Sequence, residues 1–245
     1  MAKQLIALVT GANKGLGKEV VRQLGRRGML VYLGSRDPGR GEAAASELID
    51  EGLQVILTQL DVTDEASIEA VAAQIGHRHG ELNVLVPNAG VLHRMPALLT
   101  TASNMLATYD TNVFGVVRTI HGLLPLLQAA EHPRIVNVAS TSASLTFTSD
   151  PTTLFGQSDT SLAYASSKAA VTMLTVHYAN AFRRSPAHAH IKINSATPGY
   201  IATDLNKRAG TRTVEEGAKI VVKLATLPDD GPSGGFFDDD GAVPW

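Results

Sequence analysis

The chain has 245 residues, of which 44% are hydrophobic, 18% charged and 5% aromatic. This length suffices for one substantial hydrophobic core, so we expect a single domain over residues 1–245. Lys and Arg number 21 against 23 Asp and Glu, and a formal net charge of −2 argues against general attraction to nucleic acid phosphates. The absence of cysteine excludes disulfides, thiolate metal sites and thiol nucleophiles.

The beginning of the chain carries no sign of membrane targeting. Met1–Gln4 leads into Leu5–Val9, an apolar run too short for a signal peptide. No segment has the roughly 18 consecutive apolar residues that a membrane span requires. We therefore expect a cytoplasmic protein with no membrane partner.

Short apolar runs rich in β-branched residues alternate along the chain with segments of helical periodicity. The expected strands are Leu5–Val9, Met29–Leu33, Gln54–Leu57, Leu82–Val86, Arg134–Val138, Ile191–Ile193 and a short last one at Gly234–Phe237. The expected helices are Gly17–Arg27, Gly41–Glu51, Asp64–His77, an amphipathic segment Ala107–Leu127, Ser161–Arg183 and one that begins after Thr213. This alternation predicts an α/β fold, built from βαβ units with helices on both faces of a parallel sheet.

Four residues of that pattern are typical of helix ends. Asp64 is expected to cap its helix, and Gly28, Gly52 and Gly80 are expected to end helices.

The first strand leads into a glycine-rich turn, Thr10–Gly17, and a helix follows. Gly11, Gly15 and Gly17 lie where the backbone turns tightly, approaches a ligand and lets the helix pack on its strand. The free N–H groups and positive dipole at the start of that helix suit a pyrophosphate. The spacing is G-x3-G-x-G rather than G-x-G-x-x-G, so the position after the first strand carries more weight than the glycines alone.

The end of the second strand predicts which dinucleotide binds. Ser35 and Arg36 suit a 2′-phosphate, whereas a carboxylate there would bind the ribose 2′-hydroxyl. Lys14 adds a second positive charge, and although either cation alone is as readily a surface residue, the two together favour NADP(H) over NAD(H). Asp37 is the competing observation, because its carboxylate would serve NAD.

Tyr164 and Lys168 are four residues apart on an expected helix and so share one face. An ammonium beside a phenol lowers the phenol pKa toward working pH, which suits a general acid or base. Ser140, after the strand Arg134–Val138, has a hydroxyl that would stabilise a developing alkoxide. A lone Tyr-x3-Lys pair is usually a solvated helix face, Ser140 alone could simply end a strand, and it is the order of these residues after the glycine turn that favours catalysis.

These motifs resemble, in order, those of the short-chain dehydrogenase/reductase family over essentially the whole chain. They are Thr10-Gly11-x3-Gly15-x-Gly17, Asn88-Ala89-Gly90, Asn112, Ser140, Tyr164-x3-Lys168 and Pro198-Gly199. Asn13-Lys14 and Ser35-Arg36-Asp37 look most similar to the NADPH-dependent carbonyl reductases. The resemblance implies a single-domain Rossmann fold, a doubly wound seven-stranded parallel sheet of strand order 3-2-1-4-5-6-7.

The resemblance also implies roles for individual residues. Tyr164 would exchange a proton with the substrate oxygen, Lys168 would lower the pKa of Tyr164 and hold the nicotinamide ribose, and Ser140 would bind the same oxygen. Asn112 would position a water in a proton relay, and Asp61 would contact the adenine end. The implied NADP(H) site consists of Gly11, Asn13, Lys14, Gly15, Leu16, Gly17, Ser35, Arg36, Asp61, Val62, Asn88, Ala89, Gly90, Tyr164, Lys168, Pro198, Gly199, Ile201 and Thr203.

The chain departs from the family pattern in two places. Pro87 stands where the family usually has asparagine, which removes an amide and is expected to loosen the local hydrogen bonding. The segment between Ser140 and Tyr164 is longer than usual by an insertion of about 145–160. Because the resemblance implies that such an insertion obstructs the helix pairing of tetrameric members, we expect a monomer or weak homodimer.

The insertion and a short substrate loop at about 200–212 are expected to border the substrate. The candidates for the lining of that pocket are Val91, Leu92, Met95, Phe147, Leu154, Phe155, Tyr200 and Leu205. Ordinary packing is an equally good interpretation of each one taken singly.

The leading function is NADPH-dependent reduction of an aldehyde or ketone to an alcohol, with a small-molecule carbonyl or alcohol as the only expected partner. An NADP-dependent alcohol dehydrogenase working mainly in the oxidative direction is the first alternative, and a non-catalytic NADPH-sensing or binding protein is the second. A Rossmann-like methyltransferase would have no use for Tyr164 and Lys168. His77/His79 and His188/His190 lack accompanying carboxylates, so no metal site is expected.

Overall fold

The computed structural model describes residues 3–245. Met1 and Ala2 lie outside this range. They belong to the expected domain 1–245 and to the N-terminal segment in which no signal peptide was expected. Within the described residues, seven strands form one sheet in the order β3-β2-β1-β4-β5-β6-β7. The strands are β1 (Ile6–Val9), β2 (Leu30–Ser35), β3 (Val55–Gln59), β4 (Val84–Val86), β5 (Arg134–Val138), β6 (Lys192–Ala196) and β7 (Phe236–Phe237).

All neighbouring strands of this sheet run parallel. The predicted doubly wound sheet and its strand order are therefore confirmed. The order reverses between β1 and β4, and in open parallel sheets ligands bind outside the carboxyl ends of the strands at such a point.

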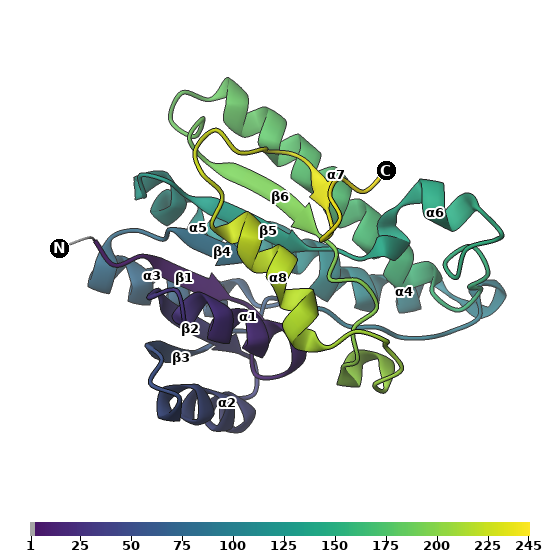
Figure 1. Cartoon of the computed structure of the whole chain (residues 1–245), viewed down its shortest axis with the longest axis horizontal. Coiled ribbons are helices and arrows are strands. Elements are labelled where there is room, and N and C mark those ends of the chain that lie inside the picture. Colours follow the sequence, from purple (N-terminus) through teal and green to yellow (C-terminus); the bar gives the residue numbers. More distant parts are fainter. Residues whose placement is uncertain (1–2) are drawn as a thin grey trace.

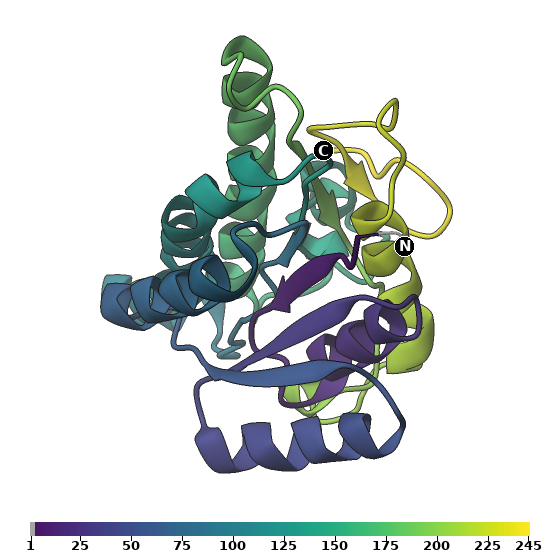
Figure 2. The same cartoon turned by 90° about the vertical axis from the view of Figure 1, so that its left-hand side faces the viewer.

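Helices connect the strands and cover both faces of the sheet (Figure 1 and Figure 2). They are α1 (Gly15–Gly25), α2 (Pro38–Asp50), α3 (Glu65–His79), α4 (Ala102–Tyr109), α5 (Gly115–Ala129), α6 (Leu145–Ser149), α7 (Leu162–Arg184) and α8 (Val214–Ala225). Shorter turns are the 3-10 turns η1 (Ala97–Leu99), η3 (Thr141–Ala143) and η4 (Asp204–Asn206) and the π-helical turn η2 (Asp110–Phe114). No helix within residues 3–245 is long and apolar enough to cross a membrane.

Alternation of side chains along each strand divides the core into two layers. Ala7 and Val9 of β1 pack in one cluster with α1, α2 and α8. Ile6 and Leu8 of the same strand pack in the other cluster with α3, α5 and α7. Since every second residue faces the same side, a strand that is apolar throughout holds helices on both faces.

Several expected helix ends are confirmed. Asp64 caps α3 by accepting a hydrogen bond from the backbone N–H of Ala66 at 3.0 Å. Gly80 ends the same helix with a φ of 74°, a left-handed conformation that glycine adopts without a steric cost. Thr213 caps α8 in a reciprocal arrangement with Glu216.

The structure corrects the bounds of several expected segments, and two of the corrections concern α5 and β6. The stretch Ala107–Leu127 is not one uniform helix, because the π-helical turn η2 separates α4 from α5. β6 occupies Lys192–Ala196 rather than Ile191–Ile193, since the polar side chains at its end are buried with partners. Asn194 donates to the carbonyl oxygen of Pro232 at 2.8 Å, and Ser195 shares a hydrogen bond with Thr175 at 2.8 Å.

Candidate active site

A cavity of about 1290 Å³ lies at the carboxyl ends of the strands. The glycine turn borders it on one side, and Asn88, Ala89 and Gly90 after β4 border it beside that turn. Residues that follow β5 and β6 and the start of α7 complete its wall. The expected residues that line it are Gly11, Asn13, Lys14, Gly15, Leu16, Gly17, Arg36, Asp61, Val62, Asn88, Ala89, Gly90, Ser140, Tyr164, Lys168, Pro198, Gly199, Ile201 and Thr203.

The glycine turn is shaped by the close approach of backbone segments. Gly11 has a φ of 61°, and a Cβ atom there would lie 2.8 Å from the Cα atom of Ala89. A Cβ atom at Gly17 would lie 2.5 Å from Nδ2 of Asn88. Lys14 precedes α1 without a side-chain cap, so the first N–H groups of that helix have no side-chain partner from it. A helix start of this kind binds phosphate.

Thr10 and Asn88 hold the turn against the end of β4. The Thr10 hydroxyl accepts hydrogen bonds from the backbone N–H groups of Asn88 and Ala89, at 3.0 and 2.9 Å. Nδ2 of Asn88 donates in return to the carbonyl oxygen of Thr10 at 2.8 Å. Pro87 accepts a hydrogen bond from the N–H of Val138 at 3.1 Å, so its carbonyl keeps β4 connected to β5.

The segment after β2 and the first turn of α2 each present an arginine to the cavity. Arg36 and Arg40 both line it, and Arg36 forms no ion pair within residues 3–245. Asp37 is engaged locally, because it caps α2 by accepting from the N–H of Arg40 at 3.0 Å. Ser35 is fully buried, and its hydroxyl donates to the carbonyl oxygen of Asp37 at 2.7 Å, so its side chain does not line the cavity.

Arg40 is a candidate that the sequence analysis missed. The helix was expected to begin at Gly41, whereas α2 begins at Pro38 and includes Arg40 in its first turn. Proline at a first helical position, preceded by an aspartate cap, is the signal that would have found it.

An ion pair joins the glycine turn to the substrate loop. Nζ of Lys14 lies 3.1 Å from a carboxylate oxygen of Asp204, and Lys14 lowers the pKa of that carboxyl. Asp204 belongs to η4, inside the segment 200–212 that was expected to be the substrate loop. The two loops are therefore in direct electrostatic contact.

Lys168 is held at the carboxyl end of β5. Its Nζ donates to the backbone carbonyl oxygen of Val138 at 2.7 Å and lies 5.8 Å from the centre of the Tyr164 ring. The residue is only 5% exposed, and burial lowers the pKa of Lys168 to about 8. A buried ammonium loses hydration, so its neutral form becomes accessible near physiological pH.

The pKa of Tyr164 moves against expectation. Burial raises the pKa of this phenol above its ordinary value, and a hydrogen bond with Ser140 acts in the opposite direction with a smaller effect. Burial, and not the expected effect of Lys168, therefore sets the direction of the Tyr164 pKa shift. At neutral pH the phenol carries its proton and is ready to act as an acid.

Asn112 lies beside the cavity rather than in its lining. It is fully buried in the π-helical turn η2, and its Oδ1 accepts from the N–H of Val91 at 2.8 Å. Its Nδ2 donates to the carbonyl oxygen of Val91 and to the Ser167 hydroxyl, each at 3.0 Å. Both amide protons are therefore used by the protein, and the side chain joins α7 to the loop after Gly90.

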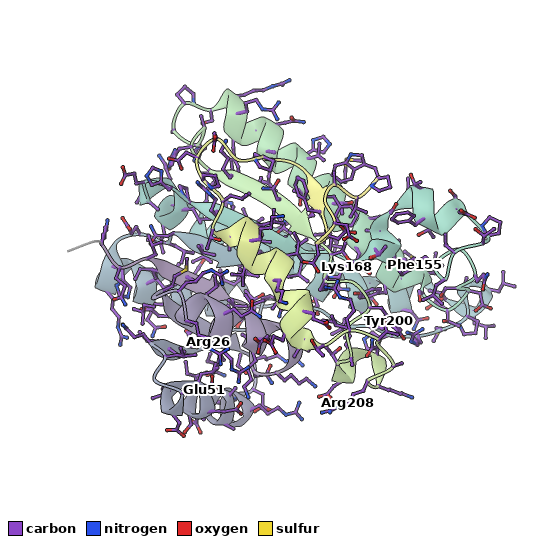
Figure 3. The ribbon with its side chains drawn as sticks, viewed as in Figure 1. Arg26, Glu51, Phe155, Lys168, Tyr200 and Arg208 are labelled. Carbon is purple, nitrogen blue, oxygen red and sulfur yellow. The ribbon has the colours of Figure 1, made fainter. Side chains whose placement is uncertain are left out.

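Apolar side chains from the insertion and from the expected substrate loop form part of the cavity lining. Phe155 from the insertion and Tyr200 from the substrate loop line the same cavity as Lys168 (Figure 3). Of the expected lining residues, those present are Val91, Leu92, Leu154, Phe155, Tyr200 and Leu205. The assignment of Met95 and Phe147 to this lining is wrong. Met95 lines a separate cavity of about 200 Å³, and Phe147 packs against Ala139, Ala143 and Phe236.

The histidine pairs form other contacts. His79 shares a hydrogen bond with the Tyr32 hydroxyl at 2.9 Å, and His188 shares one with the Ser185 hydroxyl at 2.8 Å. Within residues 3–245, no three His, Cys, Asp or Glu side chains gather as metal ligands would.

Comparison of this chain with known proteins finds a matching family model, similar sequences and similar solved structures. The family model described as short chain dehydrogenase matches residues 5–214. A short-chain dehydrogenase/reductase 1 from Saponaria officinalis is 35% identical over 300 aligned positions, with 100% of this chain and 97% of the relative covered. Carbonyl reductase (NADPH) 1 of Rattus norvegicus is 34% identical, with 98% of each chain covered. The crystal structure of an NADPH-bound carbonyl reductase from chicken fatty liver matches with a TM-score of 0.87 and 28% identity, over 100% of both chains.

Proposed function

Because the chain belongs to the short-chain dehydrogenase family of oxidoreductases, we propose that it is an NADPH-dependent carbonyl reductase that converts an aldehyde or ketone to an alcohol. The observation that carries the proposal is that Ser140, Tyr164 and Lys168 line the same cavity as the glycine turn. The relatives named carbonyl reductase support the direction of the reaction.

The residues present fit a dinucleotide with a 2′-phosphate. Gly11 and Gly17 lack a Cβ atom where Ala89 and Asn88 approach most closely, so the turn packs against the segment after β4. This packing fixes the turn in front of the start of α1, where a pyrophosphate would bind. Lys14, Arg36 and Arg40 supply positive charge at one end of the cavity, and Asp37 is already used by α2. We infer that these three cations hold the 2′-phosphate, and that Asp61 and Val62 border the adenine.

When bound, NADPH would supply a hydride, that is one proton with two electrons, to the carbonyl carbon. Tyr164 donates its phenolic proton to the carbonyl oxygen, and its raised pKa keeps that proton in place until it is needed. The Ser140 hydroxyl donates a hydrogen bond to the same oxygen as negative charge develops there. Lys168 places a positive charge beside the phenol and stabilises the phenolate that the transfer leaves behind.

Asn112 supports this arrangement from outside the cavity. By holding Val91 and Ser167 together, it fixes the loop after Gly90 relative to the helix that carries Tyr164 and Lys168. We infer a positioning role for its side chain. The relay water that the family resemblance implies stays a proposal, and the side-chain amide protons of Asn112 are already donated to Val91 and Ser167.

Consumption of NADPH by the purified protein tests the proposal. The absorbance of the reduced nicotinamide is followed with aldehydes, ketoesters, aryl ketones and quinones, and NADH is the comparison. Carbonyl-dependent oxidation that is much faster with NADPH is the expected result. Tight NADPH binding with no oxidation by any member of the panel would favour a sensing or binding protein instead.

Three further expectations stay proposals. We propose that residues 1–245 act as one catalytic unit in the cytoplasm, and that the protein is a monomer or weak homodimer. The insertion lies in front of α7, where the backbone N–H of Ala97 donates to Asp159 at 2.7 Å and that of Met95 donates to Thr160 at 3.1 Å.

A further inference from the structure

A second serine lies beside Ser140. Oγ of Ser142 is 2.9 Å from Oγ of Ser140, and the backbone N–H of Ser142 donates to the same oxygen at 3.3 Å. Ser140 precedes the 3-10 turn η3 and caps it, which fixes the relative position of the two residues. Both line the large cavity. Ser142 therefore brings two hydrogen-bonding groups to one catalytic oxygen.

The turn that carries Ser142 is braced by the insertion. The hydroxyl of Thr148, in α6, donates to the backbone carbonyl oxygen of Ser142 at 3.3 Å. α6 itself begins at a cap, where the Ser144 hydroxyl accepts from the N–H of Phe147 at 3.2 Å. The segment that departs in length from the family pattern thus contacts the turn beside the reacting atoms.

The Ser140 hydroxyl oxygen has two hydrogen-bonding neighbours in Ser142, the hydroxyl and the backbone N–H. A serine hydroxyl has one proton to donate and two lone pairs to accept with. If Ser140 donated to Ser142, no proton would remain for a carbonyl oxygen. If Ser142 donates, it and the backbone N–H occupy both lone pairs of Ser140. The Ser140 proton then remains for the side on which it meets Tyr164, where the carbonyl oxygen would lie. Ser140 Oγ is the one hydrogen-bond partner of the Ser142 hydroxyl within residues 3–245, so donation by Ser142 satisfies both groups.

We propose that Ser142 is a positioning residue for the reduction, whose hydroxyl donates to Ser140 and thereby directs the single Ser140 proton at the carbonyl oxygen. Donation to Ser140 also polarises its O–H bond, which strengthens the hydrogen bond to a developing alkoxide. The inference rests on the proposed function, since it concerns the oxygen that Ser140 serves.

Steady-state kinetics of Ser142→Ala tests the proposal. One of two donors to Ser140 is lost while the backbone N–H remains, so kcat should fall roughly three- to tenfold, as for the loss of one neutral hydrogen bond. The KM for the carbonyl and the Kd for NADPH should change less than about twofold. Ser142→Thr keeps the hydroxyl and should restore most of kcat. Thr141→Val, which removes a hydroxyl of the same turn that bonds Thr197 rather than Ser140, should retain kcat.

A double-mutant cycle separates positioning from direct contact with substrate. In a Ser140→Ala background, Ser142→Ala should cause no further loss, because the residue acts only through Ser140. Multiplicative losses, or a wild-type kcat in Ser142→Ala, would overturn the inference while leaving the proposed function intact. Absence of carbonyl reduction by the unaltered protein would instead reject the proposed function.

Discussion

Lys168 donates from Nζ to the backbone carbonyl oxygen of Val138 at 2.7 Å, so the strand that presents Ser140 also anchors the lysine of α7. Two of the three proposed catalytic side chains, Ser140 and Lys168, are therefore positioned by the end of β5. This hydrogen bond holds the ammonium where it is shielded from water. Burial lowers the pKa of Lys168, so the charged lysine reduces the stability of the folded chain.

Replacing Lys168 by methionine should stabilise the fold and abolish activity. Burial lowers the pKa of Lys168 from 10.5 to about 8, which corresponds to an unfavourable contribution of about 3 kcal/mol to the free energy of unfolding when the lysine is charged. The pKa is lower in the folded than in the unfolded chain. The cost is therefore fully present below pH 8 and declines as pH rises from about 8 to 10.5.

Thermal unfolding of Lys168→Met against the unaltered protein measures this effect. The gain in Tm should be largest near neutral pH and should shrink as the pH approaches 10.5. Lys219→Met, at an exposed position of α8, should show no such pH-dependent gain. A variant that is equally destabilised at all pH values would show that the hydrogen bond to Val138 outweighs the burial of charge.

Tyr164→Phe should remove the acid and leave the cavity intact. The phenyl ring keeps its place on α7 while the proton donor is lost, so turnover should fall by about 10² to 10⁴. The Kd for NADPH, from quenching of protein fluorescence, should stay within about twofold of the unaltered value. Tyr178→Phe makes the same chemical change later on the same helix and should keep activity. Retained turnover in Tyr164→Phe would require another proton donor.

Arg36 and Arg40 should discriminate NADPH from NADH. Replacing either by alanine removes hydrogen bonds to a charged phosphate, so the KM for NADPH should rise about tenfold or more and that for NADH should change little. Arg27→Ala, on the exposed turn after α1, should change neither. Equal increases with both cofactors would show that the 2′-phosphate binds elsewhere.

The insertion should keep the protein a monomer or weak homodimer in solution. Light scattering at micromolar concentration should give the mass of a monomer, with a dimer appearing as the concentration rises. A stable tetramer would contradict the expected obstruction of helix pairing before α7. The measurement needs only the purified chain.

Local patterns predicted much of this molecule. The glycine turn, the strand ends and the spacing of Tyr164 and Lys168 follow from φ constraints, two-sided apolar strands and helical periodicity, which act between near neighbours. The insertion was located by its length. Its aromatic residues were only partly assigned, because Phe155 and Phe147 have similar surroundings in sequence but face the cavity and the core respectively.

Local sequence patterns could not predict the contacts between segments that are distant in the sequence. Nothing near Asn112 in sequence indicates that Ser167 will engage its amide, or that a π-helical turn will bring it there. The direction of the Tyr164 pKa shift depends on burial set by the whole fold. The same holds for the ion pair between Lys14 and Asp204, which are 190 residues apart in the sequence.

Removing the Asp204 carboxylate should strengthen NADPH binding. Asp204 lies 3.1 Å from Lys14 and thus competes with an anionic cofactor for the same ammonium. Asp204→Asn should lower the Kd for NADPH several-fold, and added salt should shrink the difference because both residues are half exposed.

The effect should vanish in a Lys14→Ala background, since no ammonium is left to compete for. Glu42→Gln, at an exposed position of α2, is the matched control for loss of one negative charge. If Asp204→Asn instead weakens NADPH binding, the ion pair with Lys14 serves to hold the substrate loop over the cofactor. In that case the weaker binding of NADPH should persist at high salt, because it would come from loss of order in the substrate loop and not from the change in charge.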